Sequence, residues 1–165
     1  MSAPILLKSM EIKETKDIQE IEDMILSCYK TDSELLEKYH VLAPNSLGNC
    51  VSDTVMCFRV SLNEYNLVIY KIYDNDVFCG YFGVNEHLGL KTVVGFFIMP
   101  EYRTDEFKGI WLRYLMSKFD NHILCALYSK NIRGIKFLLN MGFEDLKLNF
   151  DSEGFEAQLF GLKNS

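Results

Sequence analysis

The spacing of apolar residues predicts that the chain opens with a strand and a helix. Met10–Lys13 can form the strand. Thr15 follows it and is suited to cap a helix, because its hydroxyl can accept a hydrogen bond from a first-turn N–H. The apolar stripe of the predicted helix recurs at helical spacing, at Ile18, Ile21, Ile25 and Cys28.

A second helix start is indicated by Thr31 and Glu34, whose spacing is that of a capping box. Pro44 ends this predicted helix, because the residue before a proline is driven out of the helical region. Asn45–Asn49 is then predicted to be a loop. The apolar residues that the helix carries are Leu35, Leu36 and Tyr39.

From Thr54 the pattern changes to that of β-strands. Four segments rich in β-branched and aromatic residues follow one another, separated by turn-forming residues such as Asp74-Asn75-Asp76. Pro100 ends the last of them, and their close succession predicts an antiparallel meander. The four predicted strands are Val55–Val60, Leu67–Tyr73, Val77–Val84 and Thr92–Met99.

The rest of the chain alternates helices and strands. Gly109–Phe119 is predicted to be a helix, and Ile123–Tyr128 a short apolar strand. Asn131 can cap a further helix over Ile132–Asn140, and Gly142 suits its C-terminal stop, where a left-handed residue is common. Two final strands are predicted over Asp145–Phe150 and Phe155–Leu162.

This order of elements predicts one α/β domain over residues 1–165. A single mixed, mostly antiparallel sheet with helices on both faces is the natural way to bury these apolar stripes. Hydrophobic residues make up 48% of the chain, which favours a packed globule. No apolar run reaches the roughly 20 residues that cross a bilayer, so no membrane partner is expected.

Charge and cysteine content argue against several classes of function. The formal net charge is -6 and no basic stripe is visible, so nucleic acid is not an expected partner. The five cysteines form no CxxC pair, which argues against a disulfide framework and against a metal site. Free thiols, and an N-terminus without the pattern of a secretion signal, predict a cytoplasmic location.

Two stretches of the sequence are similar to a known superfamily. Phe96–Arg103, which reads FFIMPEYR, resembles the end of the fourth strand and the Pro-x-x-Arg turn of the GNAT superfamily of N-acetyltransferases. Asn131–Phe143 resembles that superfamily's later segment, which runs from an Asn through a helix to Gly-Phe. Asp76–Tyr81 and Leu88–Lys91 look like the corresponding parts of the short GNAT-like proteins of tailed bacteriophages.

The resemblance implies transfer of an acyl group, typically acetyl, from acyl-CoA to the amine of a small molecule or a protein. It also implies that the fourth and fifth strands splay apart to admit the pantetheine arm of CoA. A helix N-terminus would receive the pyrophosphate, because the helix dipole favours an anion there. The residues that the resemblance places at acyl-CoA are Phe97, Ile98, Met99, Arg103, Thr104, Lys108, Gly109 and Asn131.

The sequence departs from the superfamily pattern in two places. The family's loop is usually Arg/Gln-x-x-Gly-x-Gly/Ala, but Arg103–Gly109 has one displaced glycine, and its Asp105 and Glu106 would repel a pyrophosphate. Leu138 stands where many members carry a tyrosine that protonates the leaving thiolate. No catalytic residue is therefore assigned. Two substitutes, each weighed against a purely structural role, are His87 and Tyr128.

Two functions of different class stay open. One is an acyl-CoA-dependent N-acyltransferase with a degenerate pyrophosphate loop. The other is a non-catalytic GNAT-like accessory or virion protein of a phage, which would act as a homo-oligomer or with a phage structural partner, in the host cytoplasm or the virion. The altered loop and Leu138 favour the second, whereas the Pro-Glu-Tyr-Arg turn and Asn131 favour at least ligand binding.

Overall fold

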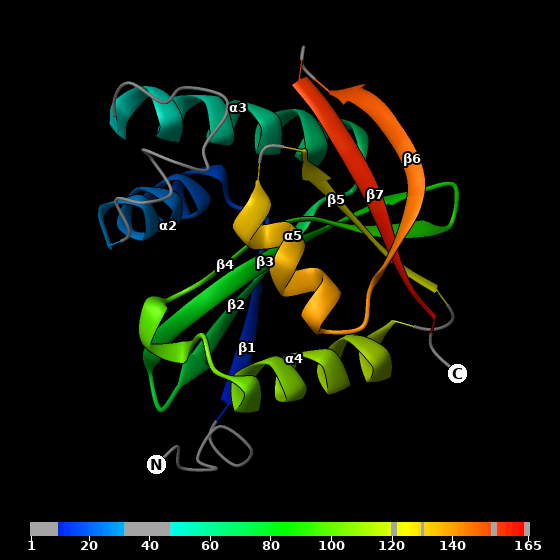
Figure 1. Ribbon diagram of the computed structural model, residues 1–165. Coiled ribbons are helices and arrows are strands. Elements are labelled where there is room, and N and C mark those ends of the chain that lie inside the picture. The colour runs from blue at the N-terminus through cyan, green and yellow to red at the C-terminus, as the bar shows by residue number, and fades with distance from the viewer. Residues whose placement is uncertain (1–9, 32–46, 120–121, 130, 153–154, 164–165) are drawn as a thin grey trace.

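The structure is a computed structural model that describes residues 10–31, 47–119, 122–129, 131–152 and 155–163 (Figure 1). The opening of the chain lies outside the described residues, and so does the helix predicted behind Thr31 with its stop at Pro44. The first described elements are β1 (Met10–Thr15) and α2 (Ile18–Thr31), where the apolar pattern predicts a strand and a helix.

The described strands form one seven-stranded sheet in the order β1-β2-β3-β4-β5-β7-β6. Neighbouring strands are antiparallel except β4 and β5, which run parallel. The prediction of a mixed, mostly antiparallel sheet is thus confirmed. The remaining strand bounds are β2 (Val68–Asp74), β3 (Val77–His87), β4 (Leu90–Ile98), β5 (His122–Tyr128), β6 (Glu144–Ser152) and β7 (Phe155–Lys163).

Helices cover both faces of the sheet, each over an apolar core of its own (Figure 1). The core under α2 and α3 (Leu47–Glu64) includes Tyr81 of β3. The core under α4 (Asp105–Lys118) and α5 (Ile132–Asn140) includes the next residue, Phe82. Successive side chains of a strand point to opposite faces, so β3 contributes to both cores in turn.

The prediction for the segment before β2 is wrong. Leu47 to Glu64 is one helix, α3, where a strand over Val55–Val60 was expected. The loop predicted over Asn45–Asn49 is replaced by this helix from Leu47 on, and its first two residues lie outside the described residues. The physical reason is visible in burial: Val55 and Phe58 are buried, whereas Met56 and Val60 are exposed. Spacing of buried residues by three is helical, and tertiary packing overrides the strand preference of the β-branched residues.

Two predicted helix starts need correction. α4 begins at Asp105 and not near Gly109, because the Thr104 hydroxyl accepts from the Phe107 N–H at 3.1 Å and caps the helix. α2 is capped by Asp17, whose Oδ1 accepts from the Gln19 N–H at 2.9 Å. Thr15, the predicted cap, is the last residue of β1.

Both ends of α5 lie where the sequence predicts them. Asn131 is the N-cap, since its Oδ1 accepts from the Gly134 N–H at 3.0 Å. Gly142 follows the helix with φ of +101°, a left-handed conformation that glycine adopts without strain.

The parallel strands β4 and β5 pair only over a short distance. Thr92 pairs with Leu124, and Val93 with Cys125, and the described ladder between the two strands ends there. Toward Ile98 on β4 and Tyr128 on β5 the strands therefore separate (Figure 1). This agrees with the splaying of the fourth and fifth strands that the resemblance implies, and it opens the sheet between them.

Candidate functional site

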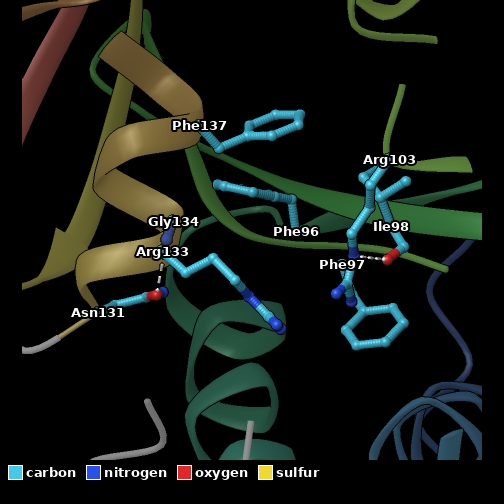
Figure 2. Close-up of a pocket in the computed structure, with 8 residues that line it drawn as sticks. All are labelled: Phe96, Phe97, Ile98, Arg103, Asn131, Arg133, Gly134 and Phe137. Carbon is cyan, nitrogen blue, oxygen red and sulfur yellow. Dashed lines mark hydrogen bonds between the residues drawn. The ribbon is translucent and has the colours of Figure 1, made fainter. Parts of the chain in front are cut away.

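A pocket lies where β4 and β5 separate (Figure 2). Its volume is about 430 Å³, which includes space that is open to solvent. One wall is the end of β4 with the turn that follows it, and the other is the first half of α5. The lining residues are Phe96, Phe97, Ile98, Arg103, Asn131, Arg133, Gly134 and Phe137.

In β4, the backbone N–H and C=O groups of every second residue face the opening. The Met99 N–H donates to Cys79 O of β3 at 2.7 Å. A Cβ placed on Gly80 would lie 2.2 Å from Phe97 O, so that carbonyl also points to β3. Neighbouring residues of a strand direct their N–H and C=O groups to opposite edges. The polar groups of Phe96 and Ile98 therefore face the separated side, where a peptide-like ligand could pair with them.

Arg103 ties the turn after β4 to the end of that strand. Its Nε donates to Ile98 O at 2.8 Å, and its guanidinium carbon lies 5.3 Å from the centre of the Phe97 ring (Figure 2). The hydrogen bond leaves the Ile98 N–H and the Phe96 backbone groups to face the opening. Arg103 thus helps to shape the edge of the pocket as well as bringing positive charge to it.

Tyr102 anchors the same turn, the short 3-10 helix η2 (Pro100–Tyr102), to the β2–β3 end of the sheet. Its hydroxyl donates to Asp74 Oδ2 at 3.3 Å. Burial, followed by the neighbouring Cys79 and Asp74, raises the pKa of Tyr102 to about 12. The phenol therefore stays protonated at neutral pH and keeps donating to Asp74, which fixes the start of the turn that carries Arg103.

The first turn of α5 forms the facing wall. A Cβ added to Gly134 would lie 2.8 Å from Asn131 Nδ2, so the small residue makes room for the capping side chain. Asn131 also lines the pocket, which gives its side chain two tasks, to cap the helix and to present its amide to the opening.

The floor of the pocket is aromatic. The ring of Phe96 lies 5.5 Å from Trp111 and 5.4 Å from Phe137, and those two rings are 5.8 Å apart. Trp111 is only 1% exposed, so this cluster joins the pocket to the core beneath α4. Such a surface favours an apolar or extended ligand over a strongly hydrated one.

The structure brings together half of the residues that the sequence predicts for the cofactor. Phe97, Ile98, Arg103 and Asn131 line the pocket. The other predicted residues stand outside its lining, with Thr104 serving as the cap of α4 and Gly109 lying within that helix. The remaining two are Met99 and Lys108.

Sequence reasoning missed four lining residues: Phe96, Arg133, Gly134 and Phe137. Gly134 and Phe137 are three apart and lie on one face of α5, a spacing that the sequence carries. Phe96 follows from the alternation of strand residues, once it is known which edge of β4 is paired. That pairing is a tertiary feature, which the sequence pattern does not contain.

None of the three positions at which the sequence was examined for a proton carrier lies in the pocket lining. Leu138 is 0% exposed and packed in the core. His87 pairs with Leu90 at the hairpin between β3 and β4, at the other end of these strands from the pocket. Tyr128 is the last residue of β5 and pairs with Ala157 of β7. Among the described lining residues there is no carboxylate, imidazole, thiol or phenol.

Comparison with solved structures identifies the architecture. The chain is similar to an acetyltransferase of Thermus thermophilus, with a TM-score of 0.65 and 10% identity over 94% of this chain and 97% of the other. A probable GNAT-family acetyltransferase of Chromobacterium violaceum gives a TM-score of 0.64 and 10% identity, over 95% and 88%. The fold is that of the GNAT acetyltransferases.

A third GNAT-fold neighbour carries a ligand. The PaiA N-acetyltransferase of Thermoplasma acidophilum, in complex with coenzyme A, gives a TM-score of 0.59 and 12% identity over 93% of this chain and 99% of the other. No protein-family model matches the sequence, and no curated protein matches it.

Across the described part of the chain, no helix is long and apolar enough to span a membrane. The same residues contain no group of three His, Cys, Asp or Glu side chains placed to hold a metal ion.

Proposed function

We propose that this chain is an acyl-CoA-dependent N-acyltransferase that transfers an acetyl group to an amine. The proposal rests on the pocket at the point where β4 and β5 separate. One of its walls is the backbone edge of Phe96 and Ile98, which β5 does not pair, and Asn131 lies on the other wall. The pantetheine arm contains two amide groups, which can pair with a strand edge as another strand would. The aromatic floor suits its methylene groups.

The chemistry requires one bond to form and one to break. The acyl-CoA supplies a thioester, and the amine nitrogen bonds to its carbonyl carbon while the carbon–sulfur bond breaks. The amine loses a proton and the departing thiolate gains one, so the products are an amide and a free thiol. With an apolar residue at Leu138, this chain would contribute mainly by positioning the thioester, which by itself can account for much of a rate enhancement.

The proposed donor-binding residues combine the sequence predictions with the lining of the pocket. Phe96 and Ile98 would pair with the arm, Asn131 would donate from its amide, and Arg103 would supply positive charge. Arg133 lies on the α5 wall and would add a second cation (Figure 2). The other proposed residues, taken from the sequence pattern and the lining, are Phe97, Met99, Thr104, Lys108, Gly109, Gly134 and Phe137.

Calorimetric titration with acetyl-CoA tests this proposal. Arg103→Ala should weaken binding by about tenfold or more, because it removes a cation and the bond that shapes the strand edge. Lys118→Ala is the control: it removes one positive charge from an exposed position at the far end of α4 and should leave the affinity unchanged. Equal affinities for the parent and both variants would place the ligand elsewhere and refute the proposal.

A second candidate function is a ligand-binding module without turnover, such as a phage accessory or virion protein. The specific observation in its favour is that Leu138 is apolar and fully buried, while the described lining residues offer no acid or base. Acetyl-transfer assays over a panel of small amines and amine-bearing peptides separate the two. Transfer supports the enzyme, whereas tight acetyl-CoA binding without any transfer supports the module.

A further inference from the structure

The backbone donors in the turn after β4 are already used inside the turn. The N–H groups of Tyr102, Arg103 and Thr104 donate to carbonyl oxygens at 2.9, 3.2 and 2.9 Å. A pyrophosphate is bound strongly where several backbone N–H groups point outward together. This turn therefore does not offer such a cradle. The acceptors, in the same order, are the carbonyls of Met99, Pro100 and Tyr102.

Two N–H groups in the first turns of α4 also donate within the chain. The Phe107 N–H donates to the Thr104 hydroxyl at 3.1 Å, and the Lys108 N–H donates to Thr104 O at 3.0 Å. Between these groups and the turn stand two residues, Asp105 and Glu106, and both are acidic. Negative side chains in the first turn already complement the helix dipole, so they reduce the attraction for a further anion.

The side chains at this helix start repel phosphate. Lys108, the first cation within α4, lies with its Nζ 3.0 Å from Asp105 Oδ1 and is partly neutralised by that contact. Glu106, the second residue of α4, is half-buried, and its Oε1 has no hydrogen-bond partner among the described residues. A carboxylate in the first turn of the helix repels a phosphate that approaches the same turn.

The part of the pocket that suits a pantetheine arm shows no such defects. The edge of Phe96 and Ile98 faces the opening, the floor is aromatic, and Asn131 lies across from it. We propose that this site recognises its acyl donor through the pantetheine thioester arm and gains little from the pyrophosphate or the adenosine. Acyl-CoA is then one acceptable donor among acyl-pantetheine thioesters. This inference rests on the proposed function.

Titrations of the full chain with CoA, 4′-phosphopantetheine and pantetheine test the inference. We expect the three dissociation constants to agree within about tenfold. CoA binding more than about 100-fold tighter than pantetheine would overturn the inference while leaving the proposed function intact. Binding of none of the three at millimolar concentration would overturn both.

Removing one negative charge gives an independent test. Glu106→Gln should tighten CoA binding by about two- to fivefold, because the helix start becomes more attractive to phosphate, and should leave pantetheine binding unchanged. Glu101→Gln is the control, since Glu101 is an exposed acid on η2 that stands outside α4. Unchanged CoA affinity in Glu106→Gln, or an equal gain in Glu101→Gln, would contradict repulsion by the first turn of α4.

Discussion

Leu138 limits the chemistry that the pocket can perform. Its side chain, on the core-facing side of α5, is fully buried and carries no exchangeable proton. The polar side chains among the described lining residues are arginines, which stay charged, and an amide, and none of these transfers a proton near neutral pH. At the scale of single residues, we therefore expect any acetyl transfer to depend on positioning of the thioester rather than on proton transfer by the protein.

Replacing Leu138 separates the effect of bulk from that of a proton donor. Leu138→Tyr and Leu138→Phe should both lower the free energy of unfolding by about 1–3 kcal/mol, because each overpacks a buried site. Only the tyrosine adds a hydroxyl, so only Leu138→Tyr should raise acetyl transfer, by about 10²-fold or more if the hydroxyl reaches the thiolate. Denaturant titrations and transfer rates measure the two effects. Equal rates in the two folded variants would show that a donor at this position is irrelevant.

Buried thiols predict how stability responds to alkaline pH. Burial raises the pKa of Cys28 from 9.0 to about 12, and it raises the pKa of the fully buried Cys125 further. Above pH 9 the unfolded chain loses these protons while the folded chain retains them. Stability is therefore complete below this pH and falls as the pH rises above it.

The expected loss is about 1.4 kcal/mol of unfolding free energy per buried thiol for each pH unit above about 9. Urea denaturation at about pH 8, 9 and 10 measures it. Cys28→Ala should reduce the loss of unfolding free energy per pH unit by the contribution of one thiol. A free energy of unfolding that stays constant from about pH 8 to 10 would contradict the assigned burial of these residues.

At the scale of elements, α5 combines a structural cap with a wall of the pocket. Asn131→Ala should lower the free energy of unfolding by about 1 kcal/mol, since the Gly134 N–H loses its acceptor. Asn131→Ser retains a capping oxygen and should stay close to the parent in stability. Both variants should bind acetyl-CoA more weakly, because both lose the amide that lines the pocket. Full affinity in Asn131→Ser would mean that Asn131 only caps the helix.

The elements also show which patterns in the sequence were informative. The cap at Asn131 and the stop at Gly142 depend on local chemistry, and both are where the sequence predicts them. α3 was missed because its β-branched residues resemble a strand locally, and only packing against α2 and the sheet selects the helix. The start of α4 was detectable, since Thr104 followed by two acids is an ordinary N-cap pattern.

At the scale of the whole molecule, the parallel direction of the two strands beside the opening follows from connectivity. β4 and β5 are joined through α4, and a helical crossover makes the two strands parallel. The sequence pattern therefore predicts parallel strands, whereas their separation and the residues beside it were implied by the resemblance to the GNAT superfamily. It does not predict which edge of β4 faces the opening, because that depends on pairing with β3 over residues distant in sequence.

A crystal structure of the protein with acetyl-CoA would show directly where the donor binds. We predict that the pantetheine arm lies between β4 and β5, that its amides pair with the backbone of Phe96 and Ile98, and that it contacts Asn131. We also expect the pyrophosphate to make few contacts with the first turn of α4. Acetyl-CoA bound away from the separation of β4 and β5 would contradict the assignment of this pocket as the donor site.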